Sequence, residues 1–486
     1  MAWCEAQLTD FEQKDDAKAL EQYQAIAERL ENGDYLDWAS QVYYRIAALI
    51  GDQRDANKPE DREELLEILE KGLAKNEHDK DCLSYKAWLL KKSGRLEDAL
   101  YIYHKLEEEP NHPINIEHNL ADIYYRNLGK NAKKSLHYYR LVMERNEHPD
   151  FYFYAATCGR YIGDYEAAEK DFLREQELAP DDVDGFNGLA YVYEAMNRYE
   201  DALTQVNKAI DLVQERKGDF SFLYSHKIQI LRRLDRPSDA LATLTEANVK
   251  YNQTPNYRLK FDICCQFGLW SDAKKVLDAW KKSKTSQSGY HTATVKYELY
   301  QGNAKKANSL FLKAAKGMNG NDLDSLRLLL AELENDVPKL VEIWNRKLDT
   351  TNDDTHALMN LAQVLWRDGR RDEAREAAAK ALSLLEEQLK LYMNNEVLYR
   401  GRRAMVLALC GRLEDARAQL ADAMKMPLCE GCSYGVCKDA YIFEASIEEC
   451  CGDPKKALEL YRAGLERWPD ELDFLSGINR LTKKSK

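Results

Sequence analysis

The chain has 486 residues, of which 44% are apolar and 10% are aromatic, and this content argues against wholesale disorder. Acidic residues outnumber basic residues by 83 to 70, for a formal net charge of −13, which argues against a nucleic-acid-binding protein because such a protein needs a basic face. At about 100–200 residues per domain, the length alone suggests roughly three globular domains.

The N-terminal residues 1–10 contain neither the basic segment nor the apolar core of a secretory signal. No run of about 18 apolar residues, which a membrane-spanning helix would need, occurs in the sequence. The sequence therefore predicts a cytoplasmic protein without membrane insertion.

Two helix pairs that match the later repeat only weakly are expected within residues 1–79. Ala19 and Tyr23, four residues apart, mark the second helix of the first pair. Helices over 36–50 and 60–75 form the second pair, with a longer loop between them. This range is expected to be a divergent N-terminal part of a repeat array.

From about residue 80 onward, one position recurs at intervals of 33 to 42 residues and is usually alanine. A bulky residue usually follows it four positions later, as Phe172 follows Ala168. A glycine or asparagine usually stands five positions before it, as Gly163 does, and ends the preceding helix by supplying a left-handed conformation. These spacings predict two antiparallel helices that approach closely at the small residue. The recurring positions are Ala99, Ser135, Ala168, Ala202, Ala240, Ala273, Ala307, Leu340, Ala374, Ala416 and Ala457.

The best-matching unit reads Phe186-x2-Leu189-Ala190-x2-Tyr193 in its first helix and has Ala202 at the recurring position of its second. With this pattern the chain resembles the tetratricopeptide repeat (TPR) family. The resemblance implies an all-α fold, a right-handed α-solenoid of about thirteen TPR-like helix-turn-helix repeats, in place of three globular domains. Because each repeat buries its apolar face only against its neighbours, the stability of the array is expected to depend on contacts between adjacent repeats.

The repeat pattern divides the sequence into three expected ranges. Residues 1–79 hold the divergent helix pairs, and residues 80–428 hold the tandem TPR array. Residues 429–486 hold a cysteine-containing loop, the last TPR unit and a polar tail that caps it.

The resemblance also implies a partner-binding groove, because first-helix positions line the concave face in this family. Aromatic, arginine and amide side chains at such positions favour a peptide or protein partner, since tryptophan, tyrosine and arginine dominate interface hot spots. The alternative interpretation is that some of these rings simply pack between adjacent repeats. The candidate groove residues are Trp88, Tyr125, Phe153, Arg160, Asn187, Tyr191, Gln229, Arg232, Arg258 and Trp366.

Three of the eleven cysteines lie close together near the C-terminus. Cys429, Cys432 and Cys437 have a Cys-x2-Cys spacing with a third cysteine five residues on, which is typical of metal ligands. The interpretations left open are a structural Zn²⁺ that staples the loop, a disulfide or redox pair, and unligated thiols.

No nucleophile with a partnered base and no phosphate-binding glycine motif is visible, so the sequence predicts a protein that is not an enzyme. The predicted function is a TPR scaffold or adaptor that binds a peptide or protein partner in its groove. One alternative is an auxiliary or regulatory subunit, or the repeat region, of an enzyme complex. Another is a metal- or redox-dependent sensor built on the cysteine loop.

Overall fold

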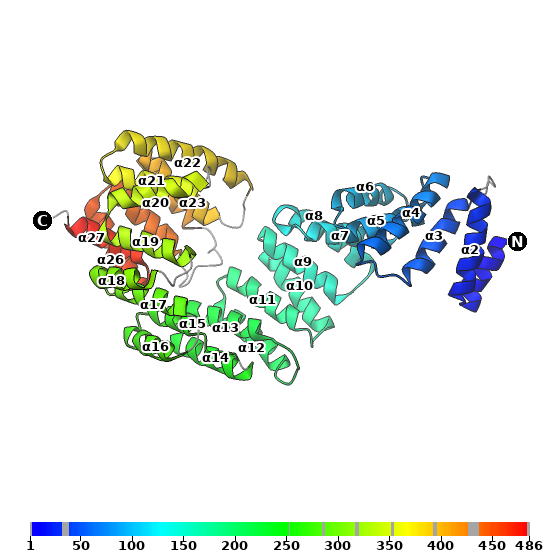
Figure 1. Cartoon of the computed structure of the whole chain (residues 1–486), viewed down its shortest axis with the longest axis horizontal. Helices are drawn as coiled ribbons and strands as arrows, with labels where there is room; N and C mark the ends of the chain where they lie inside the picture. The colour runs from blue at the N-terminus through cyan, green and yellow to red at the C-terminus, as the bar shows by residue number, and fades with distance from the viewer. Residues whose placement is uncertain are drawn as a thin grey trace. The chain divides into compact units, whose positions relative to one another are not determined.

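The computed structural model describes residues 2–31, 38–251, 253–283, 287–315, 320–350, 354–391, 396–425 and 437–483. In this part of the chain every regular element is helical, with 27 α-helices and one short π-helix (Figure 1). The predicted all-α fold is confirmed. The chain divides into two compact units, Met1–Pro180 and Asp181–Lys486, which are described separately here.

The first unit consists of helices that pack in consecutive pairs from α3 to α10. Its elements are α1 (Ala2–Gln7), η1 (Leu8–Gln13), α2 (Asp16–Glu31), α3 (Ala39–Gly51), α4 (Pro59–Lys75), α5 (Lys80–Lys92), α6 (Leu96–Glu107), α7 (Ile114–Tyr125), α8 (Leu128–Arg145), α9 (Pro149–Ile162) and α10 (Tyr165–Leu178).

The second unit continues the same pairing and adds one unpaired helix at its end. Its elements are α11 (Val183–Ala195), α12 (Tyr199–Leu212), α13 (Ser221–Arg233), α14 (Pro237–Lys250), α15 (Tyr257–Gln266), α16 (Trp270–Lys282), α17 (Gln287–Tyr300), α18 (Ala304–Ala314), α19 (Gly320–Glu334), α20 (Val337–Thr350), α21 (Thr355–Arg367), α22 (Arg371–Leu391), α23 (Glu396–Leu409), α24 (Leu413–Ala423), α25 (Lys438–Cys451), α26 (Pro454–Arg467) and α27 (Leu472–Lys483).

The pair α9 and α10 shows why the recurring residues produce this fold. Gly163 ends α9 with a φ of 82°, and the Asp164 carboxylate then accepts the Ala167 amide at 3.2 Å to start α10. Ala168 is 0% exposed and Phe172 is 1% exposed, so the small residue lies at the helix crossing and the bulky one fills the space beside it. The helix-pair prediction from these spacings is confirmed.

Ser135 shows how a different residue can occupy the recurring position. Its side chain is buried in α8, and its hydroxyl donates to the Ala121 carbonyl of α7 at 3.0 Å. The hydroxyl therefore has a partner, and the close approach of the two helices is kept.

The N-terminal helix pairs also form as expected, with one irregularity. The helices predicted over 36–50 and 60–75 are α3 and α4. The first helix of the opening pair is short and runs into the π-helix η1, where buried Asp10 accepts the Tyr23 hydroxyl of α2 at 3.1 Å.

The two boundaries predicted at 79/80 and 428/429 do not coincide with the division between the units, which falls after Pro180. Residue 428 itself lies outside the described residues. The predicted tandem array 80–428 therefore contributes to both units.

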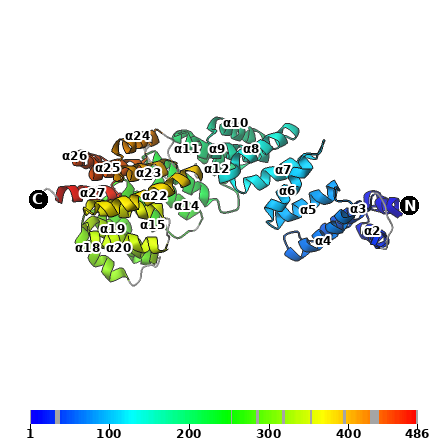
Figure 2. The same ribbon diagram turned by 90° about the horizontal axis from the view of Figure 1, so that it is seen from above.

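In the second unit the last helix packs against much earlier ones. Besides α25 and α26, α27 contacts α17 and α19. Figures 1 and 2 show α27 beside α19 in both views. Within the second unit, the last described helix therefore packs against helices from the middle of the same unit.

Candidate interaction surface

In the first unit, two of the predicted groove aromatics pack against neighbouring rings. The Trp88 ring lies 5.9 Å from the Tyr85 ring of the same helix, α5, and both pack half-buried on the core. In α7 the Tyr125 ring meets Tyr154 of α9 edge-on at 4.9 Å, and burial raises the pKa of Tyr125. The Tyr125 ring therefore stabilises the stacking of repeats.

The other two groove candidates of this unit lie on α9. Phe153 packs edge-on against buried Phe172 of α10, with ring centroids 5.8 Å apart. The Arg160 guanidinium lies 5.3 Å from the centroid of the neighbouring Tyr161 ring. Phe153 therefore also packs within its own repeat.

A buried ion pair joins α5 to α7 in the same unit. The Lys91 ammonium donates to the Asp122 carboxylate and to the Asn119 side-chain oxygen, both at 2.7 Å. Only 8% of the Lys91 side chain is exposed. Asp122 also accepts the Tyr139 hydroxyl of α8 at 2.9 Å, so one carboxylate on α7 binds groups from two other helices.

In the second unit, four residues of α11 and α13 form a polar and aromatic cluster. Buried His226 has partners at both ring nitrogens, with Asn187 Oδ1 at 2.6 Å from Nδ1 and Glu194 Oε1 at 2.5 Å from Nε2. The Tyr191 ring stacks on the imidazole with centroids 3.9 Å apart and an interplanar angle of 16°. Tyr191 nevertheless remains 40% exposed, so the cluster presents a fixed aromatic surface.

Further along the unit, three cations face one acid on α13, α15 and α17. Burial raises the pKa of Asp262, while Lys296, Arg258 and Arg232 act in the opposite direction. Arg232 also donates through Nε to Gln266 Oε1 at 2.5 Å. The charges of the groove candidates Arg232 and Arg258 therefore both act on Asp262, which lies on a first helix as they do.

The remaining two candidates have contrasting environments. Gln229 on α13 is exposed. Trp366, at the end of α21, donates its indole N–H to the Cys450 carbonyl of α25 at 2.6 Å, and the Arg371 guanidinium lies 4.0 Å from its ring centroid. Trp366 therefore joins α21 to α25.

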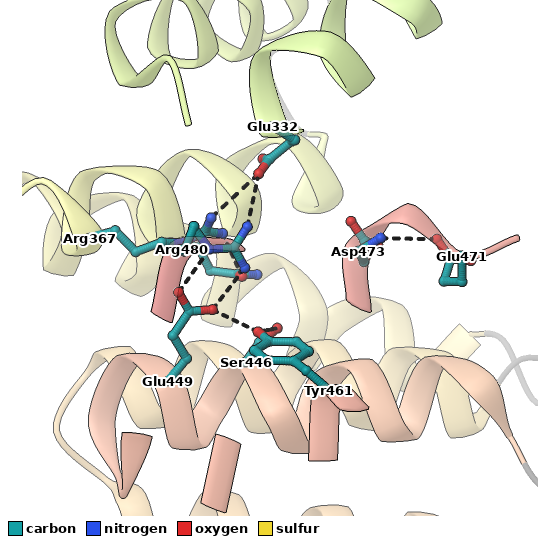
Figure 3. A network of polar contacts seen from close by, with 9 residues as sticks. Glu332, Arg367, Ser446, Glu449, Tyr461, Glu471, Asp473 and Arg480 are labelled. Carbon is teal, nitrogen blue, oxygen red and sulfur yellow. Dashed lines mark hydrogen bonds and ion pairs between the residues drawn. The ribbon is translucent and has the colours of Figure 1, made fainter. Parts of the chain in front are cut away.

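A buried charge network lies where α19, α21, α25 and α27 meet (Figure 3). Arg480 of α27 donates two hydrogen bonds to Glu449 of α25, both at 2.8 Å, and lies 3.4 Å from Glu332 of α19. Arg367 of α21 reaches the same Glu332 oxygen at 3.4 Å, and the Tyr461 hydroxyl donates to Glu449 at 2.7 Å.

The environment of Glu449 reflects these contacts. Burial alone would raise the pKa of this carboxyl, but the hydrogen bonds and charge of Arg480, assisted by Arg367, outweigh burial and hold the pKa at about 2. Sequence reasoning missed this network because its members come from five helices, α19, α21, α25, α26 and α27, that no spacing rule relates.

Two consecutive helix pairs match a known family model. The model, described as tetratricopeptide repeat, matches residues 355–380 and 397–422, which correspond to α21 with the first half of α22 and to α23 with α24. The chain contains tetratricopeptide repeats. A search of curated proteins found no match.

Several solved structures resemble this chain. YrrB, described as a TPR protein with an unusual peptide-binding site, has 18% identity and a TM-score of 0.35, covering 40% of this chain and 93% of its own. A TPR protein from Parabacteroides merdae has 17% identity and a TM-score of 0.37, covering 59% and 96%. A chain in the structure of Naa15/Naa10 bound to HypK-THB has 12% identity and a TM-score of 0.37, covering 99% and 79%.

The predicted cysteine cluster of this TPR protein falls largely outside the described residues, which include neither Cys429 nor Cys432. Cys437 precedes α25 and is 5% exposed. Among the side chains that the structure does describe, no three cysteine, histidine or acidic groups are arranged to hold a metal ion. Zinc binding by the three cysteines stays a prediction.

We expect anaerobically purified protein to contain about one zinc per chain, because three cysteines with this spacing suit a structural site. Replacing Cys432 with serine should lower the metal content and accelerate proteolysis of the last repeat. Elemental analysis and limited proteolysis measure the two effects, with exposed Cys4→Ser as the control. A zinc content below about 0.2 per chain contradicts the metal site.

Within the ranges given above, no helix combines the length and the apolar character needed to cross a membrane.

Proposed function

We propose that this TPR protein is a non-enzymatic scaffold that binds a peptide or protein segment on the first helices of its second unit, beginning at α11 and α13. The observation that carries the proposal is Tyr191, an exposed aromatic ring held flat against a buried histidine. A large ring whose position is already fixed loses little conformational entropy on binding, which suits a hot spot.

The neighbouring side chains give this surface the means to bind a polypeptide backbone. Asn187 lies one helical turn before Tyr191, and exposed Gln229 lies three residues after His226 on α13. Side-chain amides can both donate to and accept from backbone groups of an extended segment. We infer a partner that contributes an apolar or aromatic side chain to Tyr191 and backbone groups to the amides.

We also propose that this scaffold is cytoplasmic and has no nucleic-acid partner. The net charge of −13 supports the second point, because nucleic-acid binding needs a basic face. An auxiliary subunit of an enzyme complex would use the same surface, and it differs from a free-standing scaffold in having an enzyme as its stoichiometric partner.

A photo-crosslinking amino acid at Gln229 is expected to capture the partner in the full chain. The same group at Val249, which is 78% exposed on the second helix α14, should capture different proteins or none. Identical capture from both positions contradicts recognition on the first helices. Identification of the captured protein distinguishes an enzyme from other partners.

Replacing Tyr191 with alanine should weaken binding of the captured segment about 30-fold, which corresponds to about 2 kcal/mol for a hot-spot aromatic. Titration of the labelled segment against wild-type and variant chains measures this loss. Tyr101→Ala is the matched control, because Tyr101 is a 73% exposed tyrosine on α6. The affinity of this control variant for the segment should equal that of the wild-type chain. Equal affinities of all three chains would disprove the proposed site.

A further inference from the structure

The exposed side chains of α13 continue the surface around Tyr191. Phe222 is 45% exposed and lies one helical turn before His226, whose ring stacks on Tyr191. Ser225 and Gln229 lie three and seven residues after Phe222 on the same helix and are exposed as well. The surface therefore combines two exposed aromatic rings with side chains that form hydrogen bonds.

Three first helices of the second unit, α11, α13 and α15, contact one another in sequence order (Figure 1). The stack of Tyr191 on His226 joins α11 to α13, and the hydrogen bond from Arg232 to Gln266 at 2.5 Å joins α13 to α15. Packed helices have axes about 8–10 Å apart, so the axes of α11 and α15 are separated by about 16–20 Å.

The far end of this row carries two cations that the chain does not neutralise. Arg258 of α15 is exposed and Lys296 of α17 is partly exposed. Within the described residues, neither side chain forms a hydrogen bond or an ion pair. Burial raises the pKa of Asp262, and the charges of Lys296 and Arg258 act in the opposite direction. One carboxylate therefore lies near both cations, which leaves an excess of positive charge.

Arg232 does not add to this excess, because it faces other groups of the chain. Besides its hydrogen bond to Gln266, it acts on Asp470, the residue that precedes Glu471. Glu471 itself pairs with Lys438 at 2.5 Å. The uncompensated positive charge near α15 and α17 is therefore carried by Arg258 and Lys296.

We propose that the segment bound at Tyr191 carries an acidic side chain that binds Arg258 and Lys296, about five or six residues away from the apolar side chain that packs on Tyr191 and Phe222. An extended chain advances about 3.3–3.6 Å per residue, so this number of residues spans the row from α11 to α15. The inference rests on the proposed function and adds to it the charge of the partner and the spacing of its two anchors.

Charge complementarity selects this occupant over segments of other composition. A carboxylate between a guanidinium and an ammonium receives charge-assisted hydrogen bonds from both. A lysine or arginine of the partner at the same place would be repelled by Arg258 and Lys296. An apolar residue there would remove water from the two cations without giving them a partner.

A library of N-acetylated and C-amidated peptides of about ten residues tests this inference with the full chain, because blocked termini leave side chains as the only charged groups and this length contains the expected spacing. Peptides retained by the immobilised chain should be enriched in aromatic or large apolar residues at one position. They should be enriched in aspartate or glutamate five or six positions away, on either side.

Titration of one selected peptide then assigns the acidic preference to its residues. Wild-type chain should bind the glutamate form at least tenfold more tightly than the form with glutamine. In Arg258→Ala/Lys296→Ala the two forms should bind equally, and Arg258→Glu should favour the glutamine form. The matched control is Lys208→Ala/Lys313→Ala, which removes two exposed cations from second helices α12 and α18 and should keep the tenfold preference.

The possible outcomes separate this inference from the proposed function. Aromatic enrichment without acidic enrichment overturns the charge and spacing proposed here and leaves recognition at Tyr191 standing. An acidic preference that persists in Arg258→Ala/Lys296→Ala overturns the assignment to these two cations. A library with no enrichment of either kind contradicts the proposed function and this inference with it.

Discussion

Replacing Arg480 with alanine is expected to lower the free energy of unfolding of the second unit by about 3–5 kcal/mol, because breaking a buried ion pair leaves its partner charge uncompensated. Only 6% of the Arg480 side chain and 5% of the Glu449 side chain are exposed. The substitution removes both hydrogen bonds to Glu449 and the contact with Glu332. Denaturant unfolding, with hydrogen exchange to assign the transition to the second unit, measures the loss.

The pH dependence gives this variant a second readout. In the wild-type chain the pKa of Glu449 is held at about 2, below the value of about 4.5 expected in the unfolded chain. This carboxylate therefore contributes stability that is complete above about pH 5 and is lost as the pH falls from about 4.5 towards 2. Without Arg480 the contribution disappears, so the difference between wild type and variant should shrink as the pH falls through this range.

The matched control for this prediction is Arg412→Ala in the same unit. Arg412 pairs with Asp415 at 2.7 Å, but both side chains are more than half exposed. Exposed pairs of this kind contribute about 0–1 kcal/mol. Equal losses for Arg480→Ala and Arg412→Ala, or a difference that does not change with pH, would contradict the role of the buried network.

In the first unit, Asp122→Ala is expected to reduce stability by about 3 kcal/mol, because it leaves the buried Lys91 charge without its carboxylate. The same change removes the acceptor of the Tyr139 hydroxyl, which is also buried. Unfolding of the first unit, followed by exchange of its amides, measures the effect.

A second substitution distinguishes loss of the ion pair from a general loss of packing. The double variant Lys91→Met/Asp122→Leu should recover most of the lost stability, because an apolar pair of similar volume needs no charge compensation. Glu31→Ala is the exposed control, since its pair with Lys71 is about half exposed on both sides and should contribute less than about 1 kcal/mol. A double variant no more stable than Asp122→Ala would show that the charge itself is not the cause.

The parts of the fold that could be predicted are those that depend on neighbouring residues in sequence. Residues equivalent to Gly163, Ala168 and Phe172 recur with fixed spacing because each helix pair is a local structure. Ala168 and Phe172 are buried and Gly163 has a positive φ, as the helix-pair prediction requires. The sequence therefore supports prediction of each repeat and of the stack that repeats form.

The features that escaped prediction depend on distance in sequence or on burial. The spacing between Ala168 and Ala202 is 34 residues, the same as between Ala273 and Ala307. The repeat spacing therefore gives no sign of the division after Pro180. Arg480 and Glu332 are separated by 148 positions, and no periodicity relates them. Lys91 and Asp122 are residue types that usually form exposed pairs, and only packing reduces the exposure of the Lys91 side chain to 8%.

The candidate site was predictable to a similar degree. The sequence placed Asn187 and Tyr191 on one helix, and in α11 they are four residues apart and share a face. The role of His226 as the support beneath Tyr191 depends on how α11 and α13 approach each other. That approach is set by packing, which the sequence of either helix alone does not specify.

The covering of α17 and α19 by α27 has a consequence for how the chain is made. During synthesis, α17 and α19 leave the ribosome well before α27 has been translated. Their leucines therefore remain exposed while the intervening repeats fold. A nascent chain in which α27 has not yet been translated would therefore expose this apolar surface to chaperones and proteases.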